Sequence, residues 1–311
     1  MLSNTKTITN IFRHKFSNNS AIVHFQAYLS TTTKPQTKSP PLVLLSHNHD
    51  AKTSTITLNA PETLNALTVA MGHQFQSTIQ TLTNQIQTSA IQTNCLILTG
   101  SGKAFSSGGD LKWLKSLRNE PHHVNAERMY NFYKSFLCVR TLPIPVIAAV
   151  NGPAVGAGAC LALSADVTIL SPDAKVGFPF STLGIHAGMG GSHFLPLRMG
   201  RNHRCNEILL RGEILTSGEA VALGVAGRVV EDGCVLEEAE RVARDMSLGA
   251  SSLAVRGMIR TLRTREDEGL EVALRREADQ QAFCYGRNDW GEGIDAVLER
   301  RRGNFGDFYE R

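Results

Sequence analysis

Residues 150–167 read VNGPAVGAGACLALSADV, a run of small side chains between an apolar segment and a predicted helix. The apolar segment VIAAV at 146–150 is typical of a buried strand, and the helix is expected over 157–165. Glycine and alanine have no bulky side chain to cover the backbone, so main-chain N–H groups at the helix start can come close to a ligand. The stretch therefore predicts a strand, a tight loop and a helix that together present backbone donors.

The same arrangement occurs at residues 100–114, which read GSGKAFSSGGDLKWL. This segment follows a buried strand expected at 95–100 and enters a helix expected from about Asp110. The N–H groups of a first helical turn have no intrahelical partner and carry the positive end of the helix dipole. If the two strands are neighbours in one sheet, both helix starts converge and can stabilise one developing negative charge.

Strand and helix patterns alternate before residue 190, which favours an α/β fold with a largely parallel sheet. A polar segment, HNHDAK at 47–52, suits a hairpin turn between the first two strands. Apolar residues three and four apart, from Leu64 to Ile86, predict an amphipathic helix. Strands are expected at 42–46, 53–59, 95–100, 146–150, 167–170 and 175–178. Further helices are expected at 124–140, 190–200, 202–211, 217–223, 235–248, 251–264, 267–286 and 289–302.

Several motifs occur in the order and spacing of the enoyl-CoA hydratase/isomerase (crotonase) superfamily, which the chain resembles over about residues 42–308. The resemblance implies an α/β, crotonase-like spiral of ββα units with a helical C-terminal trimerisation region. It also implies homotrimers or dimers of trimers, and acyl-CoA thioester substrates, with no separate cofactor because coenzyme A is part of the substrate. The motifs are ITLNAPETLNAL (56–67), LTGSGKAFSSGGDL (98–111), PVIAAVNGPAVGAGACLALSADV (145–167), GFPFSTLGIHAGMGGSHFLP (177–196) and RNDWGEGIDAVLERRRGNF (287–305).

The resemblance places the two oxyanion-hole donors on the backbone N–H groups of Gly109 and Ala157. Two such donors suit a thioester enolate, because the charge on its oxygen grows only as the reaction proceeds. The family usually has glycine where this chain has Ala157, so the methyl group requires a right-handed backbone there. Substrate contacts are expected at Ala66, Lys103, Gly108, Gly109, Asp110, Leu111, Lys112, Gly156 and Ala157.

Both hydratase glutamates of the family are absent, because their positions fall on Cys160 and Phe180. The acid of the dienoyl-CoA isomerase branch falls on Gly188, and the histidine of the decarboxylases falls on Gly109. The hypothesis that remains makes His186 the general acid and base, because imidazole exchanges protons near neutral pH. The alternative is that His186 only packs or hydrogen-bonds within its loop.

Other polar residues near these motifs have simpler interpretations. Ser106 and Ser107 lie close to the first predicted donor, and His193 is expected inside the next helix. Cys160 is interpreted as a packing residue rather than a nucleophile, since a nucleophile would need a thiolate. Asp110 and Asp166, at a helix start and near a helix end, are interpreted as structural.

The N-terminal segment differs in composition from the rest of the chain. The first 49 residues hold five Lys or Arg and no Asp or Glu, and they are rich in Ser, Thr and Asn. This composition predicts a transit peptide over 1–40, mitochondrial (matrix) rather than plastid; the alternative is an extension without a targeting role. A crotonase-like domain is expected at 41–311, with a spiral core over about 42–200 and a helical part over about 201–311.

Charge and cysteine content exclude several classes of protein. Without the five N-terminal charges, 27 basic residues face 28 acidic ones, so nucleic-acid binding has no electrostatic support. No apolar run reaches the length of a membrane span. The six cysteines form no C-x-x-C pair, which argues against a zinc ribbon or a disulfide scaffold, and no metal site is expected.

The sequence leaves the reaction open. The main hypothesis is an enzyme of the enoyl-CoA hydratase/isomerase type in fatty-acyl or branched-chain acyl-CoA metabolism. Loss of both glutamates argues against efficient hydration, whereas isomerisation needs only one mobile proton. The alternatives are an acyl-CoA hydrolase or decarboxylase, and a catalytically silent protein that binds acyl-CoA.

Overall fold

The computed structural model describes residues 40–200, 202–230 and 234–306. From Pro41 onward the chain forms one compact unit. The transit peptide predicted for 1–40 lies, except for its last residue, outside the described part of the chain. Within the described residues, no helix has the length and apolar character needed to cross a membrane.

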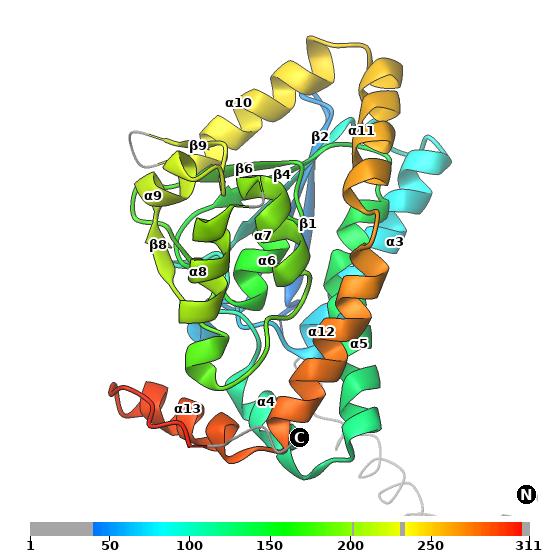
Figure 1. The fold of residues 1–311 in the computed structure, drawn as a ribbon. Helices are drawn as coiled ribbons and strands as arrows, with labels where there is room; N and C mark the ends of the chain where they lie inside the picture. Colours follow the sequence, from blue (N-terminus) through cyan, green and yellow to red (C-terminus); the bar gives the residue numbers. More distant parts are fainter. Residues whose placement is uncertain (1–39, 201, 231–233, 307–311) are drawn as a thin grey trace, which may run out of the picture. The chain divides into compact units, whose positions relative to one another are not determined.

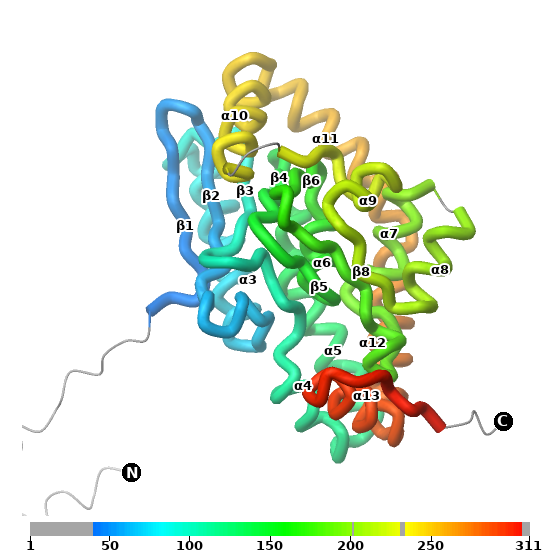
Figure 2. Tube along the Cα trace, turned by 90° about the vertical axis from the view of Figure 1, so that its left-hand side faces the viewer, coloured from blue at the N-terminus to red at the C-terminus, as the bar shows by residue number. Residues whose placement is uncertain are grey.

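A six-stranded sheet forms the centre of this unit, and its strands run in the order β1-β2-β3-β4-β6-β9. Figure 2 shows β1, β2, β3, β4 and β6 in this order. The first two strands form the predicted antiparallel hairpin, and every following pair in the sheet is parallel. The parallel pairing confirms the prediction drawn from strand–helix alternation. The strands are β1 Val43–Asn48, β2 Thr53–Leu58, β3 Cys95–Gly100, β4 Val146–Val150, β6 Val167–Leu170 and β9 Arg228–Val229.

A second sheet of three short strands lies in the order β5-β7-β8. Its strands are β5 Ala154–Val155, β7 Lys175–Gly177 and β8 Ile214–Thr216. No strand was predicted from the sequence at β5, β8 or β9. Segments of two or three residues are too short to show an alternating pattern, and their pairing partners lie far away in the sequence. The helical part after residue 201 therefore also contributes strands to both sheets.

The helices agree closely with the predicted segments, apart from the first. They are α3 Val69–Gln87, α4 Leu111–Ser116, α5 His122–Leu137, α6 Ala157–Leu163, α7 Gly191–Met199, α8 His203–Arg211, α9 Ser217–Ala222, α10 Val235–Leu248, α11 Ser252–Glu266, α12 Leu270–Tyr285 and α13 Asn288–Leu298. Single 3-10 turns occur at η1 Pro61–Thr63, η2 Leu117–Asn119, η3 Cys138–Thr141 and η4 Ser181–Leu183.

The helix predicted from Leu64 begins only at Val69. Thr68 caps it, because its side chain accepts a hydrogen bond from Met71 N. Leu64 and Asn65 before it have left-handed backbones with φ of 54° and 54°, which a helix does not allow. The apolar spacing of the helix therefore continues into a segment that has another structure, and the prediction of its start was wrong.

The two faces of the large sheet are buried by different helices. On β3, Cys95 and Ile97 face a small apolar cluster that they share with α10. The alternate residues Leu96 and Leu98 face the main core, which also holds the apolar side of α3 and much of α5. This alternation follows from the two-residue period of a strand, and it places a helical layer on each side of the sheet.

The last helices pack against the part of the chain that carries the two loops. Figures 1 and 2 both show α12 alongside α5, and α13 alongside the short helix α4. Lys115 of α4 forms an ion pair with Asp295 of α13 at 3.7 Å. Trp290 of α13 is fully buried and its ring centre lies 5.4 Å from that of Tyr285. These contacts bring the C-terminal helices to the predicted site.

Candidate active site

The two glycine-rich loops lie side by side, because the strands that precede them, β3 and β4, are neighbours in the sheet. Ser106 of the first loop forms a parallel bridge with Ala154 of the second, and Val155 N donates to the Ser106 carbonyl oxygen at 3.0 Å. The approach is close: a Cβ at Gly158 would lie 2.6 Å from the same carbonyl oxygen. Only glycine at 158 permits this contact, so the small residues serve packing between the loops as well as exposure of the backbone.

Asn65 holds the first loop in place, and the sequence analysis did not identify it. Its buried side chain accepts a hydrogen bond from Ala60 N at 2.9 Å and donates to the carbonyl oxygens of Ser101 and Ala104 at 2.9 and 2.8 Å. Asparagine is one of the few residues that adopt the left-handed backbone found here. The only sequence signal was an asparagine just before a helix, which is also common in simple turns.

The N–H groups of Gly109 and Ala157 both have no hydrogen-bond acceptor among the described residues. Their loops approach so closely that a Cβ at Gly108 would lie 3.5 Å from the Ala157 nitrogen. The positive φ values fall on the preceding residues, 91° at Gly108 and 55° at Gly156. Ala157 itself is the first residue of α6 with a right-handed backbone, so its methyl group causes no strain.

Both donors line one cavity of about 70 Å³. Of the other predicted substrate contacts, Gly108, Leu111 and Gly156 line it too, and their role in binding stays a prediction. No Asp, Glu, His, Lys or Arg is among the described residues of its wall; the polar side chains there are those of Ser107, Tyr133 and Gln281. The rest of the wall is apolar and comes from Leu111, Leu114, Met129, Phe132, Val155, Pro179, Phe180, Leu183 and Ile185.

The other predicted substrate contacts lie outside the cavity wall. Lys103 and Lys112 are exposed, and Ala66 is buried behind the first loop. Asp110 caps α4, because its carboxylate accepts a hydrogen bond from Trp113 N at 2.6 Å. That contact agrees with its structural interpretation. The exposed lysines remain available to a ligand that extends out of the cavity.

Cys160 and Phe180, on which the resemblance places the two glutamates of the family, are both buried. The Phe180 ring lines the cavity, whereas Cys160 packs behind it, where a Cβ at Gly191 would lie 3.1 Å from the thiol sulfur. Burial, with a smaller contribution from the nearby Glu277 carboxylate, raises the pKa of the Cys160 thiol well above its ordinary value. A protonated, enclosed thiol agrees with the packing interpretation.

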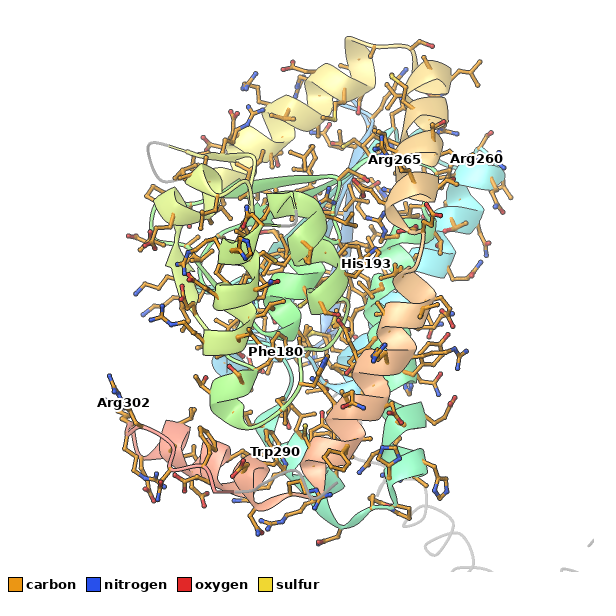
Figure 3. The ribbon with its side chains drawn as sticks, in the orientation of Figure 1. Phe180, His193, Arg260, Arg265, Trp290 and Arg302 are labelled. Atoms are coloured by element: carbon orange, nitrogen blue, oxygen red, sulfur yellow. The ribbon has the colours of Figure 1, made fainter. Side chains whose placement is uncertain are left out.

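The two candidate histidines lie in different surroundings. His186 is half-buried and does not line the cavity, although its neighbour Ile185 does; its Nδ1 lies 2.7 Å from the Ala187 carbonyl oxygen. The Nε2 of His193 lies 2.7 Å from the carbonyl oxygen of Glu266, at the end of α11. Figure 3 shows His193 well apart from Phe180. The role of His186 in proton transfer stays a prediction.

Glu277 is a second buried polar residue near the site whose role was not predicted from the sequence. It lies on α12, is 1% exposed, and accepts hydrogen bonds from Gly190 N at 2.6 Å and from Ser192 N and Oγ at 2.8 and 2.6 Å. Burial outweighs these bonds and raises the pKa of the Glu277 carboxyl from 4.5 to about 7. A single glutamate in a helix of alternating charges gives no sequence signal of such burial.

Comparison with known proteins agrees with this architecture. A family model for enoyl-CoA hydratase/isomerase matches residues 49–308. A 1,2-epoxyphenylacetyl-CoA isomerase of Escherichia coli is 34% identical over 255 residues, which cover 81% of this chain and 94% of the relative. A crotonyl-CoA hydratase of Syntrophomonas wolfei is 30% identical over 262 residues, covering 82% and 95%. A solved enoyl-CoA hydratase/isomerase of Mycobacterium paratuberculosis is 26% identical, with a TM-score of 0.72 and coverage of 83% and 99%. The chain therefore belongs to the enoyl-CoA hydratase/isomerase family.

Proposed function

We propose that this protein is an enzyme acting on acyl-CoA thioesters, and that the N–H groups of Gly109 and Ala157 stabilise the enolate of the thioester. The observation that carries the proposal is that both groups line one cavity and have no acceptor among the described residues. When the α C–H bond breaks, the proton passes to a base and the electron pair moves onto the thioester oxygen. Two fixed donors stabilise that oxygen more in the transition state than in the ground state.

Shift of a double bond is better supported than addition of water. Two glutamates are the family's means of activating water, and Cys160 and Phe180 replace them here. Proton removal and return at carbon needs one acid–base group, for which His186 is the candidate, because it directly follows the cavity-lining residue Ile185 in the chain. A second candidate function is silent binding of acyl-CoA. The observation in its favour is that no carboxylate or imidazole is among the described residues of the cavity wall.

Exchange at the α-carbon tests the proposal. The full chain is incubated with crotonyl-CoA and a 3-enoyl-CoA in deuterated water, and deuterium entry and product are measured by mass spectrometry. Ala157→Pro removes one N–H donor at a first helical position, where proline is tolerated. We expect exchange to slow by roughly 100- to 1,000-fold. Ala157→Gly, the matched control, retains the donor and should keep most of the exchange.

The results for the wild-type chain and for the Ala157→Pro variant together distinguish the candidate functions. Binding of acyl-CoA by the wild-type chain without exchange or product would support the silent binder and reject the enzyme. Exchange that is unaffected by Ala157→Pro would show that this donor is not used. If no CoA thioester binds at all, both functions fail.

We also propose a homotrimer or a dimer of trimers, in which α11 takes part in subunit contact. Arg263 is the only buried residue of α11, whereas Leu253, Met258 and Leu262 are 82%, 58% and 56% exposed. A groove of about 1340 Å³ runs along this helix. Exposed apolar surface of this kind is typical of a contact with another chain.

Mitochondrial location is a proposal that rests on the composition of residues 1–49, which carry basic but no acidic side chains. Fusion of residues 1–40 to a fluorescent protein tests it directly. Import into mitochondria would support the proposal, and a diffuse signal or plastid import would reject it.

A further inference from the structure

The cavity that Gly109 and Ala157 line, called the acyl cavity from here on, has one polar corner, formed by Tyr133 of α5 and Gln281 of α12. The third polar side chain of its wall, Ser107, is exposed, and its hydroxyl donates to the Thr63 carbonyl oxygen at 3.2 Å. Tyr133 and Gln281 are 1% and 3% exposed. A buried polar pair in an otherwise apolar wall has the greatest influence on which ligands the cavity accepts.

Hydrogen bonds fix the orientation of this corner. The Tyr133 hydroxyl donates to Gln281 Oε1 at 2.8 Å, and the Tyr285 hydroxyl donates to the same oxygen at 2.9 Å. Gln281 Nε2 donates to the His186 carbonyl oxygen at 2.7 Å. Two hydroxyl donors on one side and a carbonyl acceptor on the other leave only one arrangement of the amide. The pair is therefore ordered before any ligand arrives.

Hydrogen-bonding capacity remains after these contacts. The Tyr133 oxygen has given its single hydrogen to Gln281 and still has lone pairs that can accept. Gln281 Nε2 carries two hydrogens, and one of them has an acceptor among the described residues. The corner thus offers an acceptor and a donor next to each other.

Gly188 keeps this corner open. A Cβ at Gly188 would lie 2.6 Å from both the Tyr133 oxygen and Gln281 Nε2. Any larger side chain at 188 would push into the polar pair and fill the space in front of it. The two side chains therefore occupy the place to which an acid at position 188 would extend.

The corner carries no charge. Burial, and to a smaller extent the neighbouring acidic groups, raises the pKa of the Tyr133 hydroxyl well above its ordinary value. The hydroxyl therefore stays protonated. A carboxylate in this corner would meet the lone pairs of Tyr133 with no cation beside it among the described residues of the wall. A hydroxyl group satisfies both sites, because it donates to the Tyr133 oxygen and accepts from the Gln281 amide.

We propose that Tyr133 and Gln281 bind a hydroxyl group in the acyl cavity, and so select acyl-CoA ligands whose short, uncharged acyl chain places a hydroxyl or a water molecule in this corner. The proposal rests on the proposed function, since it requires that an acyl-CoA enters the cavity. In this proposal the Tyr133 oxygen recognises the hydroxyl group of the ligand. Gln281 holds the Tyr133 hydroxyl in position and donates the second hydrogen bond to the ligand.

The hydroxyl group has two sources, the acyl chain itself and a bound water molecule. Binding of a matched pair of ligands tests the first source, the acyl hydroxyl. Dissociation constants of the full chain for butyryl-CoA and 3-hydroxybutyryl-CoA are measured by calorimetry. We expect the hydroxylated ligand to bind roughly five- to tenfold more tightly, as one net hydrogen bond gives. Tyr133→Phe should remove this preference and leave the affinity for butyryl-CoA within about twofold of that of the wild-type chain.

Incubation of the wild-type chain with crotonyl-CoA tests the second source, a bound water molecule. If the corner holds a reactive water molecule, the wild-type chain hydrates crotonyl-CoA at a measurable rate, and Tyr133→Phe lowers kcat with little change in KM. Absence of hydration by the wild-type chain rejects this source and leaves the acyl hydroxyl as the one under test. An effect in either assay supports the proposal and identifies the source of the hydroxyl.

Tyr285→Phe is the matched control. Its hydroxyl donates to the same Gln281 oxygen, but Tyr285 does not line the cavity. We expect this variant to keep the ligand preference and the kcat of the wild-type chain. Equal losses in both variants would show that the hydroxyls only support the fold, and would overturn the proposal.

The outcomes separate this proposal from the proposed function. If butyryl-CoA binds but neither assay responds to Tyr133→Phe, the hydroxyl site is rejected and the acyl-CoA function stands. If neither acyl-CoA binds, the proposed function is rejected, and the hydroxyl site with it.

Discussion

Single residues determine where the two backbone donors point. Gly156 has φ of 55° and ψ of −122°, a conformation that is readily available only to glycine, and it turns the chain so that Ala157 begins a right-handed helix. Gly108 takes the equivalent position in the first loop, with φ of 91°. The strained positions therefore precede the donors, and the donors keep ordinary backbones. This explains how alanine can replace glycine at 157.

His186 is the residue whose chemical role most needs an experiment. We expect His186→Ala to abolish deuterium exchange at the α-carbon and to leave acyl-CoA binding unchanged, because general acid–base catalysis typically contributes about 100- to 10,000-fold. Exchange is measured by mass spectrometry, and binding by calorimetry. His193→Ala is the control, since its ring contacts the end of α11 away from the cavity. Unchanged exchange in His186→Ala would exclude His186 from the mechanism.

At the scale of elements, buried charged groups tie the C-terminal helices to the core. Glu277 of α12 accepts hydrogen bonds from the start of α7, which also satisfies backbone N–H groups there. Arg263 of α11 forms an ion pair with Asp166 at 2.5 Å and donates to the carbonyl oxygens of Leu142 and Ile144. Each contact fixes the position of one helix against the rest of the fold.

The raised pKa of Glu277 predicts a pH-dependent contribution to stability. Its folded pKa of about 7 lies above the ordinary value of 4.5, so the folded protein holds a proton that the unfolded chain has lost. The contribution of Glu277 to the free energy of unfolding is therefore complete below about pH 4.5 and is lost as the pH rises through 7. Between these two pH values the free energy of unfolding falls by at most about 1.4 kcal/mol per pH unit.

Glu277→Gln tests this contribution, because glutamine retains an acceptor and cannot ionise. We expect the free energy of unfolding of the wild-type chain, relative to that of the variant, to fall between pH 5 and pH 8. Urea unfolding at several pH values measures the difference. A constant difference over this range would contradict the prediction.

At the scale of the whole molecule, the exposed side of α11 should lie between subunits. Met258 and Leu262 are one helical turn apart and both exposed. We expect Met258→Glu with Leu262→Glu to convert the assembly into monomers, because the charges would be buried without partners. Analytical ultracentrifugation measures the change. Arg244→Glu on α10 is the control, since Arg244 is exposed and does not line the groove along α11. An unchanged assembly in the double variant would show that α11 is not part of the contact.

Much of the fold could be predicted from local pattern. The strands β3, β4 and β6 were predicted with the bounds that the structure shows, since continuous apolar runs bounded by turn residues are a strong local signal. The start of α3 was misplaced, because the apolar spacing continues through Leu64 and Leu67, where the backbone is not helical. The strands β5, β8 and β9 were missed, because each exists only through pairing with a distant strand.

The sequence by itself determined the two strand–loop–helix units and their order along the chain. These features depend on neighbours in the chain and on glycine conformation. Only the tertiary structure decided that Tyr133 meets Gln281, 148 residues away, that Gly188 leaves room for them, and that Glu277 is buried against α7. Such contacts depend on how α12 packs against α5 and α7, and no local pattern encodes that packing.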